Sequence, residues 1–147
     1  MENGKLNVLH YDRCDSGCVR LLKNSRLIKE AAEGKLELNL KDVDRAKKFG
    51  NQPNASDLLV QEEGFLFDAV IINTAGKNSD DVLEDAVFGL EYHGLPLNRI
   101  IYLHQGDYSN DLVEQGIRVV KVHGGNSYLT PKNSEQVVQA LQGLVPK

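Results

Sequence analysis

The sequence predicts an α/β fold in which a parallel sheet of five strands, in the order 2-1-3-4-5, is covered by helices on both faces. Short apolar runs of strand length alternate with segments whose apolar residues recur at helical spacing. Gly, Pro, Asn and Ser separate these segments, and no stretch is long enough to act as a linker between domains. Strands that alternate with helices form parallel sheets through right-handed crossovers, and the doubly wound order is the one we expect.

Three strands are predicted in the amino-terminal half. Leu6–Tyr11 is mostly apolar, Leu36–Leu40 alternates Leu with polar residues as a half-buried strand does, and Phe67–Ile72 is the most apolar run and should be central. A helix is expected from Gly17 to about Glu33, with Gly34 ending it. The segment Lys41–Pro53 should be irregular or a short helical turn, and Ser56–Val60 should start a brief helix that ends at Gly64.

The carboxyl-terminal half continues the alternation. Ser79 should cap a helix whose Leu83, Ala86, Val87 and Leu90 face the sheet, and Gly94 and Pro96 break it. The fourth strand is predicted at Arg99–Leu103 and the fifth at Ile117–Val122, with a short helix between them from about Ser109 to Gln115. Asn133 is expected to cap the last helix, in which Val137, Val138, Leu141 and Leu144 line one face.

Composition narrows the classes of function. A chain of 147 residues with 41% hydrophobic and 26% charged residues fits one globular domain over residues 1–147. A formal net charge of -4 argues against a nucleic-acid binder, and no run is apolar enough for a leader or a membrane span, so we expect a cytoplasmic protein. The four histidines lie on separate predicted elements without ligand spacing, so no metal site is expected, and His10 should be a satisfied strand residue.

Ligands of doubly wound sheets bind at the carboxyl ends of the strands, beside the switch in strand order. This rule selects three polar loops, at residues 12–18, 73–79 and 104–110. The first of them carries Cys14-Asp15-Ser16-Gly17-Cys18 just before the predicted helix, where backbone N–H groups and the helix dipole would favour an anion. The alternative is structural: Cys14 and Cys18 would pack under the helix start, with Asp15 or Ser16 as the N-cap.

The chain resembles response-regulator receiver domains over most of its length. Its first strand and helix, its strand Phe67–Asn73, and the segment Tyr128-Leu129-Thr130-Pro131-Lys132 before the last helix are similar to receiver segments. Asn73 stands where the family has its phosphoacceptor Asp, and an amide does not form an acyl phosphate. The resemblance therefore implies a pseudo-receiver, an interaction module. Its regulatory pocket would comprise Asp12, Asp15, Ser16, Gly17, Asn73, Thr74, His104 and Lys121.

The chain also resembles short-chain flavodoxins, whose length it matches. The loop at Cys14–Val19 is similar to the loop that cradles the FMN phosphate, and Asn73–Gly76 and Gln105–Tyr108 fall where that family holds the flavin ring. The resemblance implies an FMN-binding electron carrier with Ser16, Gly17, Thr74, Gly76, Asp107 and Tyr108 at the cofactor. The phosphate loop retains only one hydroxyl, Ser16, and the chain has no Trp.

A third resemblance is to cysteine-dependent phosphatases of the low-molecular-weight and arsenate-reductase type. Cys14 and Arg20 satisfy the pattern C-x5-R, in which a thiolate at a helix start attacks a phosphoryl group that the arginine holds. Asp107 would be the general acid. The family's Asp-Pro pair and its Ser after the arginine are missing, which favours Arg20 as a surface residue of a structural helix.

These comparisons favour a flavodoxin-like three-layer fold and a receiver-like regulatory or protein-interaction module without a cofactor. The proposed pocket centres on Asp12, Asn73, His104 and Lys121. The face made by the last two helices and the fifth strand should bind a protein partner. The chain could also form a homodimer. The FMN carrier and the C-x5-R enzyme remain the alternatives.

Overall fold

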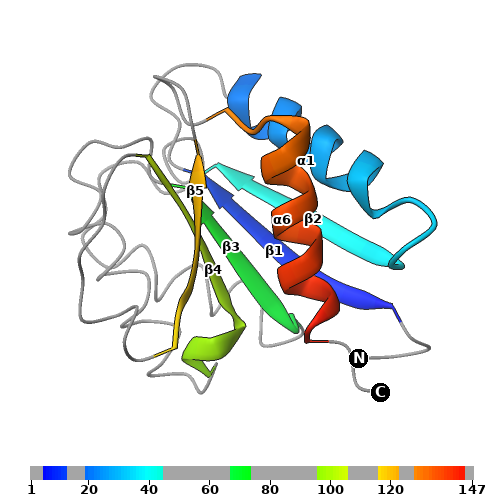
Figure 1. Cartoon of the computed structure of the whole chain (residues 1–147), viewed down its shortest axis with the longest axis vertical. Helices are drawn as coiled ribbons and strands as arrows, with labels where there is room; N and C mark the ends of the chain where they lie inside the picture. The colour runs from blue at the N-terminus through cyan, green and yellow to red at the C-terminus, as the bar shows by residue number, and fades with distance from the viewer. Residues whose placement is uncertain are drawn as a thin grey trace.

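A computed structural model describes residues 5–12, 19–44, 67–73, 96–105, 116–122 and 128–144 of the chain. Five strands, two α-helices and one 3-10 helix lie in these ranges (Figure 1). In chain order they are β1 (Leu6–Asp12), α1 (Val19–Ala32), β2 (Leu38–Asp44), β3 (Ala69–Asn73), the 3-10 helix η1 (Leu97–Arg99), β4 (Ile100–Gln105), β5 (Arg118–Val122) and α6 (Pro131–Gln142).

The five strands form one sheet in the order β2-β1-β3-β4-β5, and every neighbouring pair is parallel. The predicted strand order is therefore confirmed. The register fixes which residues meet across the sheet: Leu6 pairs with Leu38, Val8 with both Leu40 and Ala69, and Ile101 with Ile71. The carboxyl ends of all five strands consequently lie along one edge.

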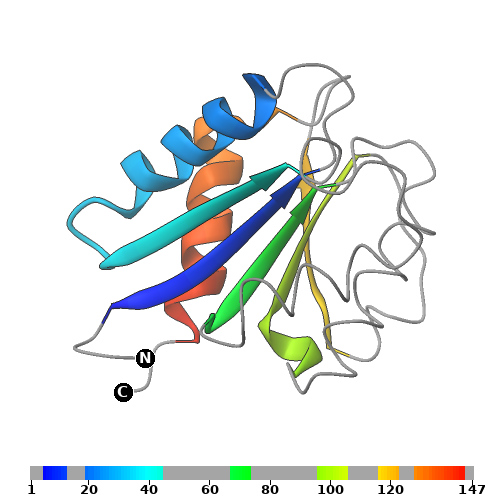
Figure 2. The same cartoon turned by 180° about the vertical axis from the view of Figure 1, so that it is seen from behind.

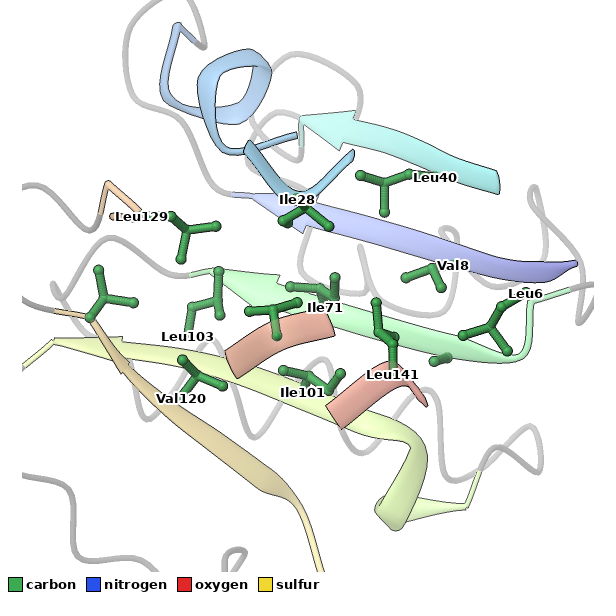
Figure 3. Close-up of a cluster of buried hydrophobic side chains, with 13 residues drawn as sticks. Leu6, Val8, Ile28, Leu40, Ile71, Ile101, Leu103, Val120, Leu129 and Leu141 are labelled. Carbon is green, nitrogen blue, oxygen red and sulfur yellow. The ribbon is translucent and has the colours of Figure 1, made fainter. Parts of the chain in front are cut away.

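Helices α1 and α6 cover the same face of the sheet, in front of it in Figure 1 and behind it in Figure 2. Between these helices and the strands lies a cluster of buried aliphatic side chains (Figure 3). Burying each such side chain is worth about 1.5–3 kcal/mol, so this layer is the main source of stability on that face. The cluster comprises Leu6, Val8, Ile28, Leu40, Ala69, Ile71, Ile101, Leu103, Val120, Val122, Leu129, Val137 and Leu141.

The opposite face of the sheet is buried as well. Strand alternation turns every second strand residue to that side, and six of these residues are at most 2% exposed. A parallel sheet buried on both faces is typical of α/β folds. The helices predicted at 56–60, 79–90 and 109–115 lie outside the described residues, so they stay predictions. The six buried residues are Leu9, Tyr11, Val70, Ile72, Ile100 and Tyr102.

Each of the five predicted strands has somewhat different bounds in the structure. The second strand does not cover Leu36–Leu40 but begins at Leu38 and continues to Asp44, so residues 41–44 are neither irregular nor helical. The reason is pairing: β2 matches β1 residue for residue from Leu6 to Asp12, which extends the strand through polar positions. The rest of the segment 41–53 lies outside the described residues.

The third strand begins at Ala69, not at Phe67. Asp68 bends the chain there, because its Oδ2 atom accepts the N–H of Asn7 at 2.8 Å while its own N–H donates to the Asn7 carbonyl at 2.7 Å. The fourth strand also shifts, since Arg99 ends η1 and β4 runs from Ile100 to Gln105. The fifth starts one residue later than predicted, at Arg118.

The last helix is capped by Thr130 and not by Asn133. Thr130 Oγ1 accepts the Asn133 N–H at 3.1 Å, and Asn133 Oδ1 accepts the Thr130 N–H at 3.4 Å. Asn133 is thus the third helical residue of a capping box, and Pro131 occupies the first turn. An Asn after a Thr-Pro-Lys sequence was mistaken for the cap because both positions carry capping residue types.

Candidate functional site

The carboxyl-terminal edge of the sheet brings four of the predicted pocket positions close together. Asp12 ends β1 and is the Cα partner of Asn73, which ends β3. On the next two strands His104 of β4 is the Cα partner of Lys121 of β5. His104 and Lys121 lie about 90 and 110 positions after Asp12 in the sequence, yet they reach the same edge because all five strands are parallel. Their common role in a pocket remains a prediction.

Of the other predicted site residues, the structure describes Arg20 alone. Arg20 is the second residue of α1 and is partly buried. The alternative catalytic residues Cys14 and Asp107 lie outside the described residues. So do the remaining loop residues assigned to the pocket or to FMN, which are Asp15, Ser16, Gly17, Thr74, Gly76 and Tyr108.

The two pocket side chains that the structure describes differ in exposure. The Asn73 side chain is completely buried, whereas Lys121 is exposed. The Lys121 backbone is held from α6, because its carbonyl accepts a hydrogen bond from Asn133 Nδ2 at 3.0 Å. Helix α6 and the end of β5 are therefore fixed to each other beside the predicted pocket.

A second acidic position at this edge was not predicted. Asp44 ends β2 and is the Cα partner of Asp12, so Asp12 lies between Asp44 on one side and Asn73 on the other. The sequence signal was the continued strand from Leu38 to Asp44, which polar residues obscured. Within the described ranges, no group of three or more His, Cys, Asp or Glu side chains is arranged to hold a metal ion.

His10 forms a buried pair with an acidic residue on the neighbouring strand. Its Nδ1 atom lies 3.0 Å from Asp42 Oδ1, and the His10 side chain is 0% exposed against 21% for Asp42. The carboxylate fixes the ring and favours the tautomer with hydrogen on Nδ1. The Nε2 atom is buried without a hydrogen-bond partner. The expectation of a fully satisfied histidine is therefore wrong at Nε2, because β1 places the ring in the largely aliphatic layer beneath α1.

Further buried polar groups lie on the helices above this end of the sheet. Asn24 of α1 is completely buried, and its Oδ1 atom accepts the Leu129 N–H at 2.9 Å, which ties α1 to the segment before α6. Ser25, the next residue, is 2% exposed, and its Oγ atom has no hydrogen-bond partner. Above these, the ammonium of Lys23 lies 5.5 Å from the centre of the Tyr128 ring, a cation–π contact.

A surface groove of about 510 Å³ lies between β5 and α6. Its walls are four consecutive residues of the edge strand and three residues from one face of the helix. These residues are Arg118, Val119, Val120, Lys121, Gln136, Gln139 and Ala140.

No helix among the described residues is long and apolar enough to cross a membrane.

No protein-family model matches the sequence, and no curated protein is significantly similar to it. Among solved structures, the fold is similar to part of a lysine decarboxylase from Francisella novicida, with a TM-score of 0.55 and 11% sequence identity. That match covers 97% of this chain but 18% of the decarboxylase. A flavoenzyme NAD(P)H:(acceptor) oxidoreductase from Paracoccus denitrificans matches with a TM-score of 0.42 and 14% identity, over 94% of this chain and 93% of that one.

At such low identity, the decarboxylase match bears on the fold alone. The chain's own sheet is parallel in the order β2-β1-β3-β4-β5, with helices α1 and α6 on one face (Figure 1). The chain therefore has an α/β flavodoxin-like fold.

Proposed function

We propose that this chain is a receiver-like regulatory module that binds a protein partner and does not accept a phosphoryl group. The observation that carries the proposal is the place of Asn73. It ends β3 beside Asp12, at the position where the receiver resemblance expects the acceptor carboxylate, and its side chain is completely buried. A carboxamide oxygen is a poor nucleophile and does not form an acyl phosphate, so phosphorylation at this position is excluded chemically.

The rest of the edge supports an altered receiver pocket. His104 and Lys121 are Cα partners on β4 and β5. In the receiver resemblance His104 occupies the position of the hydroxyl-bearing switch residue, and Lys121 is one of two candidates, with Lys132, for the family's lysine. The proposed partner surface comprises β5 and α6. The helix predicted before β5, which should complete this surface, lies outside the described residues.

The test is a pair of NMR titrations with beryllofluoride and Mg²⁺, which together mimic a phosphoryl group on an aspartate. We expect no saturable, Mg²⁺-dependent shift in the wild-type protein. In Asn73→Asp, the restored carboxylate should give such a shift at residues near Asp12 and Lys121, and Asp12→Asn in the same background should abolish it.

A saturable response of the wild-type protein would overturn the claim that phosphoryl transfer is lost. A folded Asn73→Asp variant without a response would overturn the receiver-like pocket. If the buried carboxylate prevents folding, the wild-type titration still decides the first claim.

The same purified sample tests the two alternative functions. Flavin absorbance in the visible spectrum would replace the proposal by the FMN carrier. Hydrolysis of an aryl phosphate that is lost in Cys14→Ser would replace it by the C-x5-R phosphatase. We expect neither.

A further inference from the structure

The groove between β5 and α6 runs along the outer edge of the sheet. Strand β5 is the last strand in the order, and four consecutive residues of it, 118–121, line the groove. Side chains of consecutive strand residues point to opposite faces, so this lining includes the strand's edge rather than one face alone. From α6 come Gln136, Gln139 and Ala140, which share one helix face because they are spaced three and four residues apart.

The backbone of β5 is turned partly toward this groove. The Lys121 carbonyl accepts a hydrogen bond from Asn133 of α6 and therefore points toward the helix. Because the backbone groups of a strand alternate in direction, the N–H and C=O of Val119 are turned the same way. Edge strands with outward N–H and C=O groups are templates for pairing with a further strand.

The described residues that line the groove carry positive charge, although the chain as a whole is negative. Among these residues the ionisable ones are Arg118 and Lys121, and both are exposed. The formal net charge of the chain is -4. The Arg118 guanidinium lies against the carboxyl end of α6, since a Cβ atom added at Gly143 would lie 3.2 Å from Nη1. The guanidinium is thus placed at the wall of the groove, where it can meet a carboxylate.

We infer that this groove binds an extended acidic segment of a partner protein, which pairs with the edge of β5 as an added strand. Backbone hydrogen bonds to Val119 would give affinity, and Arg118 and Lys121 would select acidic side chains on the segment. The lining residues 118–121 span roughly 13 Å at about 3.3 Å per residue, enough for about four residues of the segment. The inference rests on the proposed function, since it names the partner of a binding module.

The test is an NMR titration of the full chain with a synthetic peptide of alternating Glu and Val residues. We expect saturable shifts of the amides at 118–121 and 136–140. Arg118→Glu should raise the Kd about tenfold or more, which corresponds to the loss of one hydrogen bond to a charged group. The matched control is Arg26→Glu, which reverses the same charge on a side chain of α1 that is 66% exposed and should leave the Kd unchanged.

A second probe tests the added strand without changing the protein. The same peptide with N-methyl groups on alternate residues lacks the backbone donors needed to pair with β5, and we expect its binding to be lost. Retained binding would overturn the added-strand arrangement. Equal binding of a peptide with Lys in place of Glu, or the same shifts with single-stranded DNA, would overturn the assignment of an acidic protein segment.

The outcome of the peptide titration is independent of the beryllofluoride titration, because the latter monitors the surroundings of Asp12 on β1 and Asn73 on β3. A chain that binds the acidic peptide and also responds to beryllofluoride would refute only the loss of phosphoryl transfer. A chain that responds neither to the peptide nor to beryllofluoride would refute the binding of an acidic segment, and it would leave the proposal of an altered receiver pocket standing.

Discussion

Asn133 connects the start of α6 to the end of β5, and its replacement by Ala should be the most damaging polar substitution among the described residues. The side chain is 2% exposed. Its Oδ1 atom accepts from the Thr130 hydroxyl at 2.9 Å and from the Thr130 N–H at 3.4 Å. Its Nδ2 atom donates to the Lys121 carbonyl at 3.0 Å and to Gln136 Oε1 at 3.2 Å.

The expected cost follows from two separate losses. Removing the reciprocal half of the capping box costs about 1 kcal/mol, the usual value for a helix cap. Leaving the Lys121 carbonyl without its donor costs about 1–3 kcal/mol if the site stays dry. We therefore expect Asn133→Ala to lower the free energy of unfolding by about 3 kcal/mol, which for a chain of this size lowers the Tm by about 10 °C.

Asn133→Asp separates the two losses. A carboxylate still accepts from Thr130 and is favoured near the amino-terminal end of a helix, but it has no hydrogen to donate to Lys121. Urea denaturation followed by circular dichroism should show both variants with lowered midpoints and an unchanged m-value. Amide hydrogen exchange should accelerate in β5 in both. If Asn133→Ala stayed within about 0.5 kcal/mol of the wild type, the usual range for a surface change, the link between α6 and β5 would be refuted.

Two further substitutions test other parts of the fold. Asn24→Ala removes the acceptor of the Leu129 N–H, so it should cost about 2 kcal/mol in urea denaturation, and a change below about 0.5 kcal/mol would contradict a dry bond there. Gly34 follows α1 with φ at 75° and has no atom within 4 Å of an added Cβ. Gly34→Ala should therefore cost about 1 kcal/mol through backbone strain alone, and Gly34→Asn should cost less; equal losses in the two variants would count against a left-handed residue at 34.

The sheet could be predicted from the sequence because its strands are short apolar runs separated by helical segments. Leu6–Asp12 and Arg118–Val122 lie within a residue of their predicted bounds. The second strand was harder, since Lys41, Asp42 and Asp44 are unfavourable in an isolated strand. Its pairing with the full length of β1 overrides that local preference, and a single sequence does not contain the register.

The features of the candidate site also divide into those that the sequence predicts and those that depend on strand register. The edge positions of Asp12, Asn73, His104 and Lys121 follow from the strand order, because parallel strands end at one edge. The contact between His10 and Asp42 does not, because it depends on a register between residues 32 positions apart. The same holds for the bond from Asn24 to Leu129, which joins residues 105 positions apart. Pattern alone predicts where a ligand could bind, and register decides which polar groups of the fold are paired.

The face of the sheet beneath α1 changes its chemistry along β1 and β2. Near the amino ends of the strands, Leu6 and Val8 of β1 lie opposite Leu38 and Leu40 of β2. At the next position on the same face, His10 lies opposite Asp42, and the aliphatic layer gives way to a hydrogen-bonded pair. Aliphatic burial stabilises the fold without depending on exact partners, whereas a buried polar group must be paired. A substitution at the carboxyl-terminal edge, such as one at Asn73, should therefore change the chemistry of that edge while the aliphatic half preserves the fold.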